Sequence, residues 1–133
     1  VRGQAPSLDP DLGRQRGVVD AFLAAARDGD FDGLVAALHP DVVLRSDGGT
    51  ARARRTVLIS GARAVAAQAV TFGRLSPFAR PALINGAAGV VVVAKGRPVS
   101  VMAFTVSDGR IVAIDVLSDP ERLNGLDLTV LDG

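Results

Sequence analysis

The chain contains no cysteine, tyrosine or tryptophan, and it has a single histidine, His39. Without cysteine it can form no disulfide, no thiolate nucleophile and no cysteine-based metal site. One histidine alone does not provide the ligand spacing of a zinc site, so we expect no metal and no cofactor. Because tyrosine is missing, an enzyme built on this sequence would need another oxyanion donor or general acid.

Long apolar runs are also missing. No stretch reaches the roughly 18 consecutive apolar residues of a membrane span, and no signal peptide is visible at the N-terminus. The absence of cysteine fits a reducing compartment. We therefore expect a cytoplasmic protein that makes no contact with a membrane.

The charges nearly balance, with 15 basic and 14 acidic residues and a formal net charge of +1. Because the two signs are interspersed, the sequence does not favour direct DNA binding by this chain. A length of 133 residues, 48% of them hydrophobic, indicates one compact domain with one core. We expect a linker over residues 1–8, the domain over 9–128 and a tail over 129–133. Since the chain starts at Val1 and its only methionine is Met102, we expect it to be either a piece of a longer protein or a chain that lacks its disordered start.

The first half of the chain is typical of helices. Asp9 followed by Pro10 predicts a helix start, and Gly29 predicts the end of that helix. Asp30 can cap a second helix, which should end at residues 39–41 because proline restricts the residue before it. Ser60 can cap a third helix. The predicted inward positions are Leu12, Val19, Phe22, Leu23 and Ala26, then Leu34, Val35 and Leu38, and then Ala64, Val65 and Ala69.

The second half is typical of strands. The turn signals Asn85-Gly86, Lys95-Gly96 and Asp108-Gly109 suit tight hairpins, so we expect a mostly antiparallel sheet with sequential strands adjacent. Helices followed by a meander predict an α+β fold, in which a curved sheet wraps around the helices as a cone whose mouth can hold a pocket. The predicted strands cover residues 42–46, 54–59, 81–85, 89–94, 98–106 and 110–117.

Two carboxylates stand out as candidate site residues. Asp47 lies two residues after Arg45 on a predicted strand, so the two side chains should share a face. In a pocket they would form a buried ion pair that binds a polar ligand or activates water, and in solvent they would be an ordinary surface pair. Asp115 lies in the apolar segment RIVAIDVLS, on a face expected to carry Ile111, Ala113 and Leu117. It is either a candidate general base or a structural residue paired with an arginine.

Other residues give weaker signals. Met102 and Phe104 share a strand face, and core packing is the alternative to a role in a pocket. His39 lies in a Leu-His-Pro-Asp turn, and we interpret it as structural because it has no obvious catalytic partner. The expected lining of a pocket is Arg45, Asn85, Met102, Phe104 and Asp115.

The segment DGGTARARR is the most charged in the chain. Backbone N–H groups around Asp47, Gly48 and Gly49, together with the guanidinium groups of Arg52 and Arg54, could bind phosphate. However, the chain has neither a P-loop nor a dinucleotide fingerprint. A charged hairpin that docks on a protein partner is the other interpretation.

A family resemblance covers residues from about 11 to 128. The segments VVDAFLAAARDGDFDGLVAALHPDVVLRSDGG and GRPVSVMAFTVSDGRIVAIDVLSDPERL resemble the SnoaL-like C-terminal domain of one group of bacterial extracytoplasmic-function RNA polymerase sigma factors, the SigJ type of actinobacteria. Of the family motif Asp-Gly-Gly-Gly-Lys, the chain keeps Asp47, Gly48 and Gly49 and departs at Thr50 and Ala51. Arg52 replaces the missing lysine charge one residue later.

A second family motif, Asn-Pro-Asp-Lys-Leu, matches at two positions, Pro120 and Leu123, with conservative replacements at Asp119, Glu121 and Arg122. In the family, both motifs are implicated in contacts that regulate the sigma factor, not in catalysis. The resemblance therefore implies a non-catalytic regulatory domain that acts on the sigma regions of the same protein or on the RNA polymerase core. The implied docking residues are Asp47, Gly48, Gly49, Arg52, Arg54, Asp119, Pro120, Glu121, Arg122 and Leu123.

The same resemblance implies a cone fold shared with polyketide cyclases, limonene epoxide hydrolase and ketosteroid isomerase. Two alternatives to the regulatory function follow. The domain could sense a small apolar molecule in its pocket, or it could retain isomerase or epoxide hydrolase activity with Asp115 as the base. Since an apolar outer sheet face usually needs covering, we also consider a homodimer.

Overall fold

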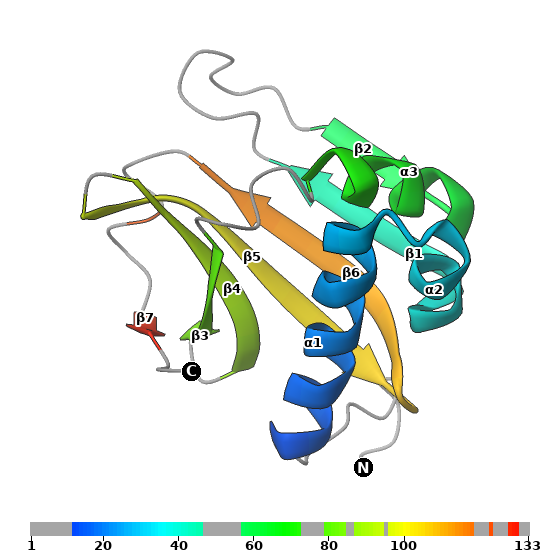
Figure 1. Cartoon of the computed structure of the whole chain (residues 1–133), viewed down its shortest axis with the longest axis horizontal. Helices are drawn as coiled ribbons and strands as arrows, with labels where there is room; N and C mark the ends of the chain where they lie inside the picture. The colour runs from blue at the N-terminus through cyan, green and yellow to red at the C-terminus, as the bar shows by residue number, and fades with distance from the viewer. Residues whose placement is uncertain are drawn as a thin grey trace, which may run out of the picture.

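Three helices pack on one side of a curved, seven-stranded sheet in the computed structural model, which describes residues 12–46, 57–72, 79–84, 87–94, 96–118, 123 and 128–130 (Figure 1). The strand order in these residues is β2-β1-β6-β5-β4-β3-β7. This arrangement confirms the predicted α+β cone. The elements are α1 (Leu12–Asp28), α2 (Phe31–Ala37), β1 (Leu38–Ser46), β2 (Val57–Ser60), α3 (Ala62–Phe72), β3 (Ala79–Ile84), β4 (Ala87–Ala94), β5 (Arg97–Ser107), β6 (Arg110–Leu117) and β7 (Leu128–Val130).

The junction between α1 and α2 follows the sequence signals closely. Gly29 has φ +71°, the left-handed conformation that ends helices, and the N–H of Asp30 donates to the carbonyl oxygen of Ala25 at 2.8 Å. The side chain of Asp30 then accepts a hydrogen bond from the N–H of Gly33 at 3.0 Å. Both the predicted stop and the predicted cap are confirmed.

We expect Asp30→Ala to lower the free energy of unfolding by about 0.5–2 kcal/mol, because α2 loses the side chain that caps its N-terminus. Urea denaturation would measure this loss. Asp20→Ala, at an exposed position within α1, is the matched control and should cost less. Equal losses in the two variants would contradict a capping role for Asp30.

Helix α2 ends earlier than predicted. It stops at Ala37, and Leu38 already has an extended backbone with φ −105° and ψ 141°. Because Pro40 disfavours a helical conformation at His39, the strand begins before the proline and not after it. The Nδ1 atom of His39 accepts a hydrogen bond from the N–H of Asp41 at 3.0 Å, which is consistent with a structural interpretation of this histidine.

The start of α3 corrects another expectation. Gly61, not Ser60, precedes the helix: its φ is +97°, and its carbonyl oxygen accepts from the N–H of Val65 at 3.0 Å. The N–H of Gly61 donates to the carbonyl oxygen of Val42 at 2.8 Å, which ties the helix start to β1. Ser60 is the last residue of β2. A positive φ lets the chain turn directly from strand to helix, and glycine adopts it without steric cost.

The inward face of α3 is also shifted from the predicted one. Ala64 is exposed, and the buried residues are Val65, Ala66 and Ala69. Around the helix axis, residue 69 lies between the directions of residues 65 and 66, one turn further along. All three can therefore face the core from a helix that is covered on one side only. The predictions for Val65 and Ala69 are confirmed, and the one for Ala64 is wrong.

The antiparallel meander from β3 to β6 is confirmed, with bounds that differ by a few residues from those predicted. Asp108 and Gly109 both have positive φ, 53° and 76°, which matches the tight turn predicted from the Asp-Gly pair. Two features of the sheet were not predicted from the sequence. Strand β1 pairs with β6 in parallel, and β7 adds a short antiparallel strand beside β3.

Strand β6 contains an irregularity that changes the expected faces. Ala113 pairs with Thr105 but Ile111 pairs with Val106, so Val112 is an extra residue in the ladder. A bulge of this kind interrupts the two-residue alternation of side chains. Ile111 therefore packs in the same core cluster as Ile114. The expectation that Ile111 shares a face with Asp115 is wrong for this reason.

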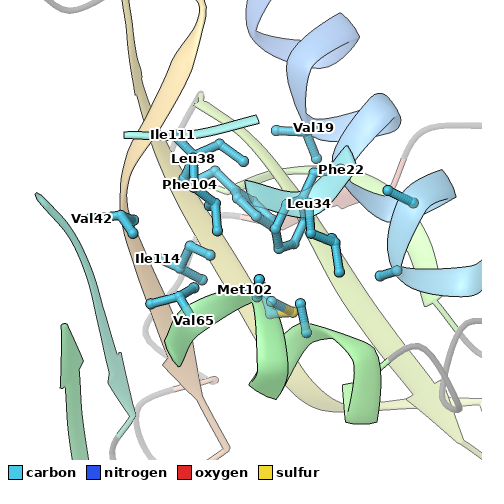
Figure 2. Close-up of a cluster of buried hydrophobic side chains, with 14 of the residues drawn as sticks. Val19, Phe22, Leu34, Leu38, Val42, Val65, Met102, Phe104, Ile111 and Ile114 are labelled. Carbon is cyan, nitrogen blue, oxygen red and sulfur yellow. The ribbon is translucent and has the colours of Figure 1, made fainter. Parts of the chain in front are cut away.

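The main core lies between the helices and the sheet, where side chains of α1 point toward β5 (Figure 2). The rings of Phe22 and Phe104 meet edge to face, with centroids 5.7 Å apart and planes at 68°. This geometry suits the charge distribution of aromatic rings. A smaller cluster contains Ala82, Ile84, Val91, Val101 and Leu123. Since β5 alternates, Val101 in this cluster and Met102 in the main core lie on opposite faces of the sheet.

Candidate functional site

An apolar cavity of about 280 Å³ lies between the helices α1 and α3 and the helix-facing side of the sheet. Most of its lining is aliphatic or aromatic, and the two polar members are a serine and a glutamine, neither of which carries a charge. The lining residues are Phe22 from α1, Leu44 and Ser46 from β1, Ile59 from β2, Gln68 and Ala69 from α3, Met102 from β5, and Ile114 and Val116 from β6.

Simple periodicities place these side chains. In β1, Leu44 and Ser46 follow fully buried Val42 at two-residue spacing, so all three point to the helix side. In α3, Gln68 and Ala69 lie one turn after buried Val65 and point to the same side. The cavity therefore lies between the helices and the sheet, in a part of this layer that the core side chains leave unfilled.

The two ends of the cavity differ in exposure. Phe22, Met102 and Ile114 are buried, whereas Gln68 is exposed. Met102 therefore lies at the floor, and the amide of Gln68 lies at the mouth. Just after β6, the hydroxyl of Ser118 donates to that of Ser100 in β5 at 3.0 Å, and neither serine is among the described lining residues.

Arg45 and Asp115, both expected in the pocket, are brought together by the structure, but outside the cavity. They are partners in the parallel register of β1 and β6, with Nε to Oδ1 at 2.8 Å and Nη2 to Oδ2 at 3.2 Å. Because Leu44 and Ile114 point into the cavity, the next residue in each strand points to the opposite face. The two side chains are 52% and 35% exposed, so this two-point pair contributes about 0–1 kcal/mol to stability.

The three other expected pocket residues differ in where they lie. Met102 lines the cavity and is 3% exposed. Phe104 packs against Phe22 in the core and is not among the described lining residues. Asn85 lies outside the described residues.

Most of the expected docking residues also lie outside the described part of the chain, so their roles stay predictions. Leu123 is described: it is 9% exposed and belongs to the smaller core cluster. Its side chain packs within the domain, and its docking role also stays a prediction. The docking residues outside the described part are Asp47, Gly48, Gly49, Arg52, Arg54, Asp119, Pro120, Glu121 and Arg122.

Within the described residues, no group of three or more histidine or acidic side chains could hold a metal ion. No helix in the same residues is long and apolar enough to cross a membrane. A second hollow, of about 490 Å³, lies along α1 and α2 between Arg14 and Gly109. It is larger than the first, but it is mostly lined by glycine and alanine and lies outside the core.

Sequence reasoning missed the residues that give the cavity its polar character. Gln68 was recognisable as a polar residue three positions after inward Val65 on α3. Ser46 was recognisable by its even spacing from Val42, once Val42 was known to be buried. Counting from Val42 also places Arg45 on the outer face.

Solved structures that resemble this chain support its fold, and one of them is a sigma factor. No family model matches the chain, and no curated protein matches it by sequence. Among solved structures, the extracytoplasmic function sigma factor SigJ of Mycobacterium tuberculosis aligns with a TM-score of 0.70 and 26% identity over 88% of this chain. The alignment spans only 45% of that sigma factor, so this chain corresponds to less than half of it.

Two other similar structures show how widely the fold is used. An epoxide hydrolase of the LEH-like type from M. tuberculosis has a TM-score of 0.51 and 23% identity, over 81% of this chain and 84% of that one. A de novo designed protein with a curved β-sheet has a TM-score of 0.58 and 18% identity, over 84% and 89%. These neighbours establish the SnoaL-like or ketosteroid isomerase-like cone for this chain.

Proposed function

We propose that the chain is a non-catalytic regulatory domain of a sigma factor, which modulates transcription initiation through contacts with the promoter-binding sigma regions or with RNA polymerase. The observation that carries this proposal is the 26% identity with SigJ, which extends over 88% of this chain. More than half of SigJ remains outside the alignment, which leaves room in that protein for other regions. The sequence motifs around Asp47 and Pro120 point to the same family.

The position of the Asp115 carboxylate supports a function without catalysis. An isomerase or hydrolase of this fold class would need an acid or base that reaches its substrate. Asp115, the strongest candidate, lies on the opposite face of the sheet from the cavity and is held by Arg45. A designed protein shares the cone, so the fold itself does not require an activity.

The smaller core cluster supports the second motif as a docking segment. Leu123 is packed near Ala82, Ile84, Val91 and Val101, so this point of the C-terminal segment is fixed to the sheet. A motif residue that is already fixed loses no further freedom when the motif binds a partner, which lowers the entropy cost of binding. Regulation then requires two arrangements of the sigma regions that make different contacts with this domain.

Transcription in vitro with the complete sigma factor tests this proposal. We expect Asp47→Ala and the double change Glu121→Ala with Arg122→Ala each to alter initiation about 5-fold or more, the usual size of a coupling between sites. Point changes are preferable to truncation at residue 119, because truncation would remove buried Leu123 and the strand β7. Asp41→Ala, at an exposed position of β1, is the control.

Two results would contradict the proposal. One is a reading frame before Val1 that encodes no sigma region. The other is an unchanged initiation rate in both docking variants when the domain is folded, which circular dichroism would verify.

A further inference from the structure

We propose that the second hollow, which lies along α1 and α2, is a docking groove for an amphipathic α-helix of the sigma region that precedes this domain in the complete protein. None of the residues that line this groove was expected as a docking residue. The proposal rests on the proposed function in one respect only, the identity of the occupant as a sigma region. It adds a surface of contact and the chemistry of the partner that fits there.

The α1 wall of the groove is one regular face of the helix. Arg14, Gly17, Val18 and Ala21 all line it, and their spacing of three and four residues places them side by side along α1. Phe22 points from a neighbouring face into the core. Helix α1 therefore carries small or apolar residues on a second side as well, over about 10 Å or two turns.

The α2 wall has the same character. Helices α1 and α2 lie side by side (Figure 1), and Gly33, Ala36 and Ala37 line the groove from α2 at the same spacing. Gly109, in the turn between β5 and β6, completes the lining. The hollow of about 490 Å³ has room for on the order of four large aliphatic side chains. Small walls of this kind fit a partner helix that carries large apolar residues at three- and four-residue spacing.

Gly17 is the lining residue that the domain itself does not explain. It lies within α1 without a positive φ, and a Cβ atom there would meet nothing within 4 Å. By contrast, Gly109 has φ +76° in its turn, and a Cβ atom at Gly33 would collide with the side chain of Asp30. Glycine is less favourable than alanine inside a helix. A second helix that packs closely over position 17 accounts for it, because glycine lets backbones approach each other.

The groove suits a protein partner better than a small molecule or a nucleic acid. Gly17, Ala21 and Ala36 are exposed, so a small molecule here would stay largely in water, whereas a helix would cover all three. The exposed carboxylates of Asp32 and Asp108 lie next to lining residues in the chain and disfavour phosphate groups. An apolar centre with charges at its rim is typical of protein interfaces.

The covalent connection favours the preceding sigma region as the source of the helix. The chain enters α1 at its N-terminal end, and Arg14, close to that end, already lines the groove. Residues 1–11 span at most about 40 Å when fully extended, so a region attached before them stays within reach of the groove. Attachment through a short segment gives an effective concentration of about the millimolar range, at which a small contact area is sufficient for docking.

Thiol labelling tests this contact in the complete sigma factor. Since the chain has no cysteine, Ala21→Cys and Ala36→Cys each place a single thiol in the domain, and mass spectrometry identifies the labelled peptide. We expect both positions to react at least about tenfold more slowly in the complete protein than in the 133-residue chain, as for a groove occupied about nine-tenths of the time. Ala67→Cys, at an exposed position of α3 outside the lining, is the control and should react equally fast in both.

A filled groove should lose this protection. We expect Gly17→Leu, combined with Ala36→Cys, to return the thiol at position 36 to the rate of the isolated chain, because the leucine side chain occupies the place of the partner. Leucine favours a helix over glycine, so the gain in reactivity does not come from unfolding of α1. Asp20→Leu, on the same helix but outside the lining, is the matched control and should keep the protection.

Four results would overturn the inference. These are equal rates at positions 21 and 36 in the complete protein and in the isolated chain, equal slowing at position 67, and protection that persists in a folded Gly17→Leu protein. The fourth is slowing that appears in the isolated chain as its concentration rises, which would assign the groove to a second copy. An unprotected groove together with altered initiation in the Asp47 variant removes this inference alone. A protected groove together with unchanged initiation in both docking variants removes the proposed function of those motifs and leaves the groove contact in place.

Discussion

Replacement of Phe22 by alanine is expected to lower the free energy of unfolding by about 3–5 kcal/mol, the largest loss among the changes considered for this domain. Phe22 is fully buried, and its ring meets Phe104 edge to face at 5.7 Å. The change removes the apolar contact of α1 with β5 and leaves a void that joins the existing cavity. The other buried residues of α1 are Val19, Ala25 and Ala26, whose small side chains cannot fill the space left by the ring.

Urea denaturation followed by circular dichroism would measure this loss. The matched control is Phe31→Ala in α2, where the phenylalanine is only half-buried and its ring lies 5.2 Å from the guanidinium carbon of Arg63. The control should lose clearly less stability, because more of its ring already contacts water. Similar losses for the two variants would show that Phe22 is not central to the core.

The second large effect is expected for Gly89→Ala in β4. A Cβ atom at Gly89 would lie 2.6 Å from the backbone oxygen of Met102 and still closer to the side chain of Ile84. The side chain can move, but the backbone oxygen belongs to the neighbouring strand of the sheet. We therefore expect a loss of about 1–3 kcal/mol in the free energy of unfolding, as for other overpacked cores.

Gly17→Ala is the control for this substitution. Gly17 lies in α1, and a Cβ atom there would meet nothing within 4 Å. Alanine favours the helix over glycine, so this variant should gain about 0.5–1 kcal/mol. Thermal or urea unfolding of the two variants should move in opposite directions, and a stabilised Gly89→Ala protein would be inconsistent with the close contact described.

Local signals in the sequence were enough to predict the order of helices and hairpins. The stop at Gly29, the cap at Asp30 and the turn at Asp108-Gly109 depend on the conformations that a few neighbouring residues can adopt. They could be predicted because glycine and aspartate have distinct backbone preferences that no distant contact overrides here. The curved sheet followed from the same hairpins.

Features that depend on distant parts of the chain could not be predicted in this way. The parallel pairing of β1 with β6 joins residues some 70 positions apart, such as Arg45 and Asp115. The bulge at Val112 reverses the alternation between Ile111 and Asp115, and nothing in the apolar segment marks it. As a result, Asp115 was considered for a catalytic role although it lies behind the cavity wall.

The candidate site was predicted only in outline. The cone fold implied a pocket, and Met102 is in its lining. Gln68 and Ser46 were missed because a single polar residue on a helix or strand is usually solvent-exposed, and its side of the sheet becomes clear only after Val42 and Val65 are placed. The resemblance to a sigma factor domain accounts for the fold, and the docking residues remain predictions.

The wall of the cavity at β6 is a single strand thick. Val116 faces the cavity, Asp115 faces outward, and the two residues are joined by one peptide bond. Any movement of this strand therefore shifts the cavity lining and the outer charged pair together, because the two residues share one backbone segment.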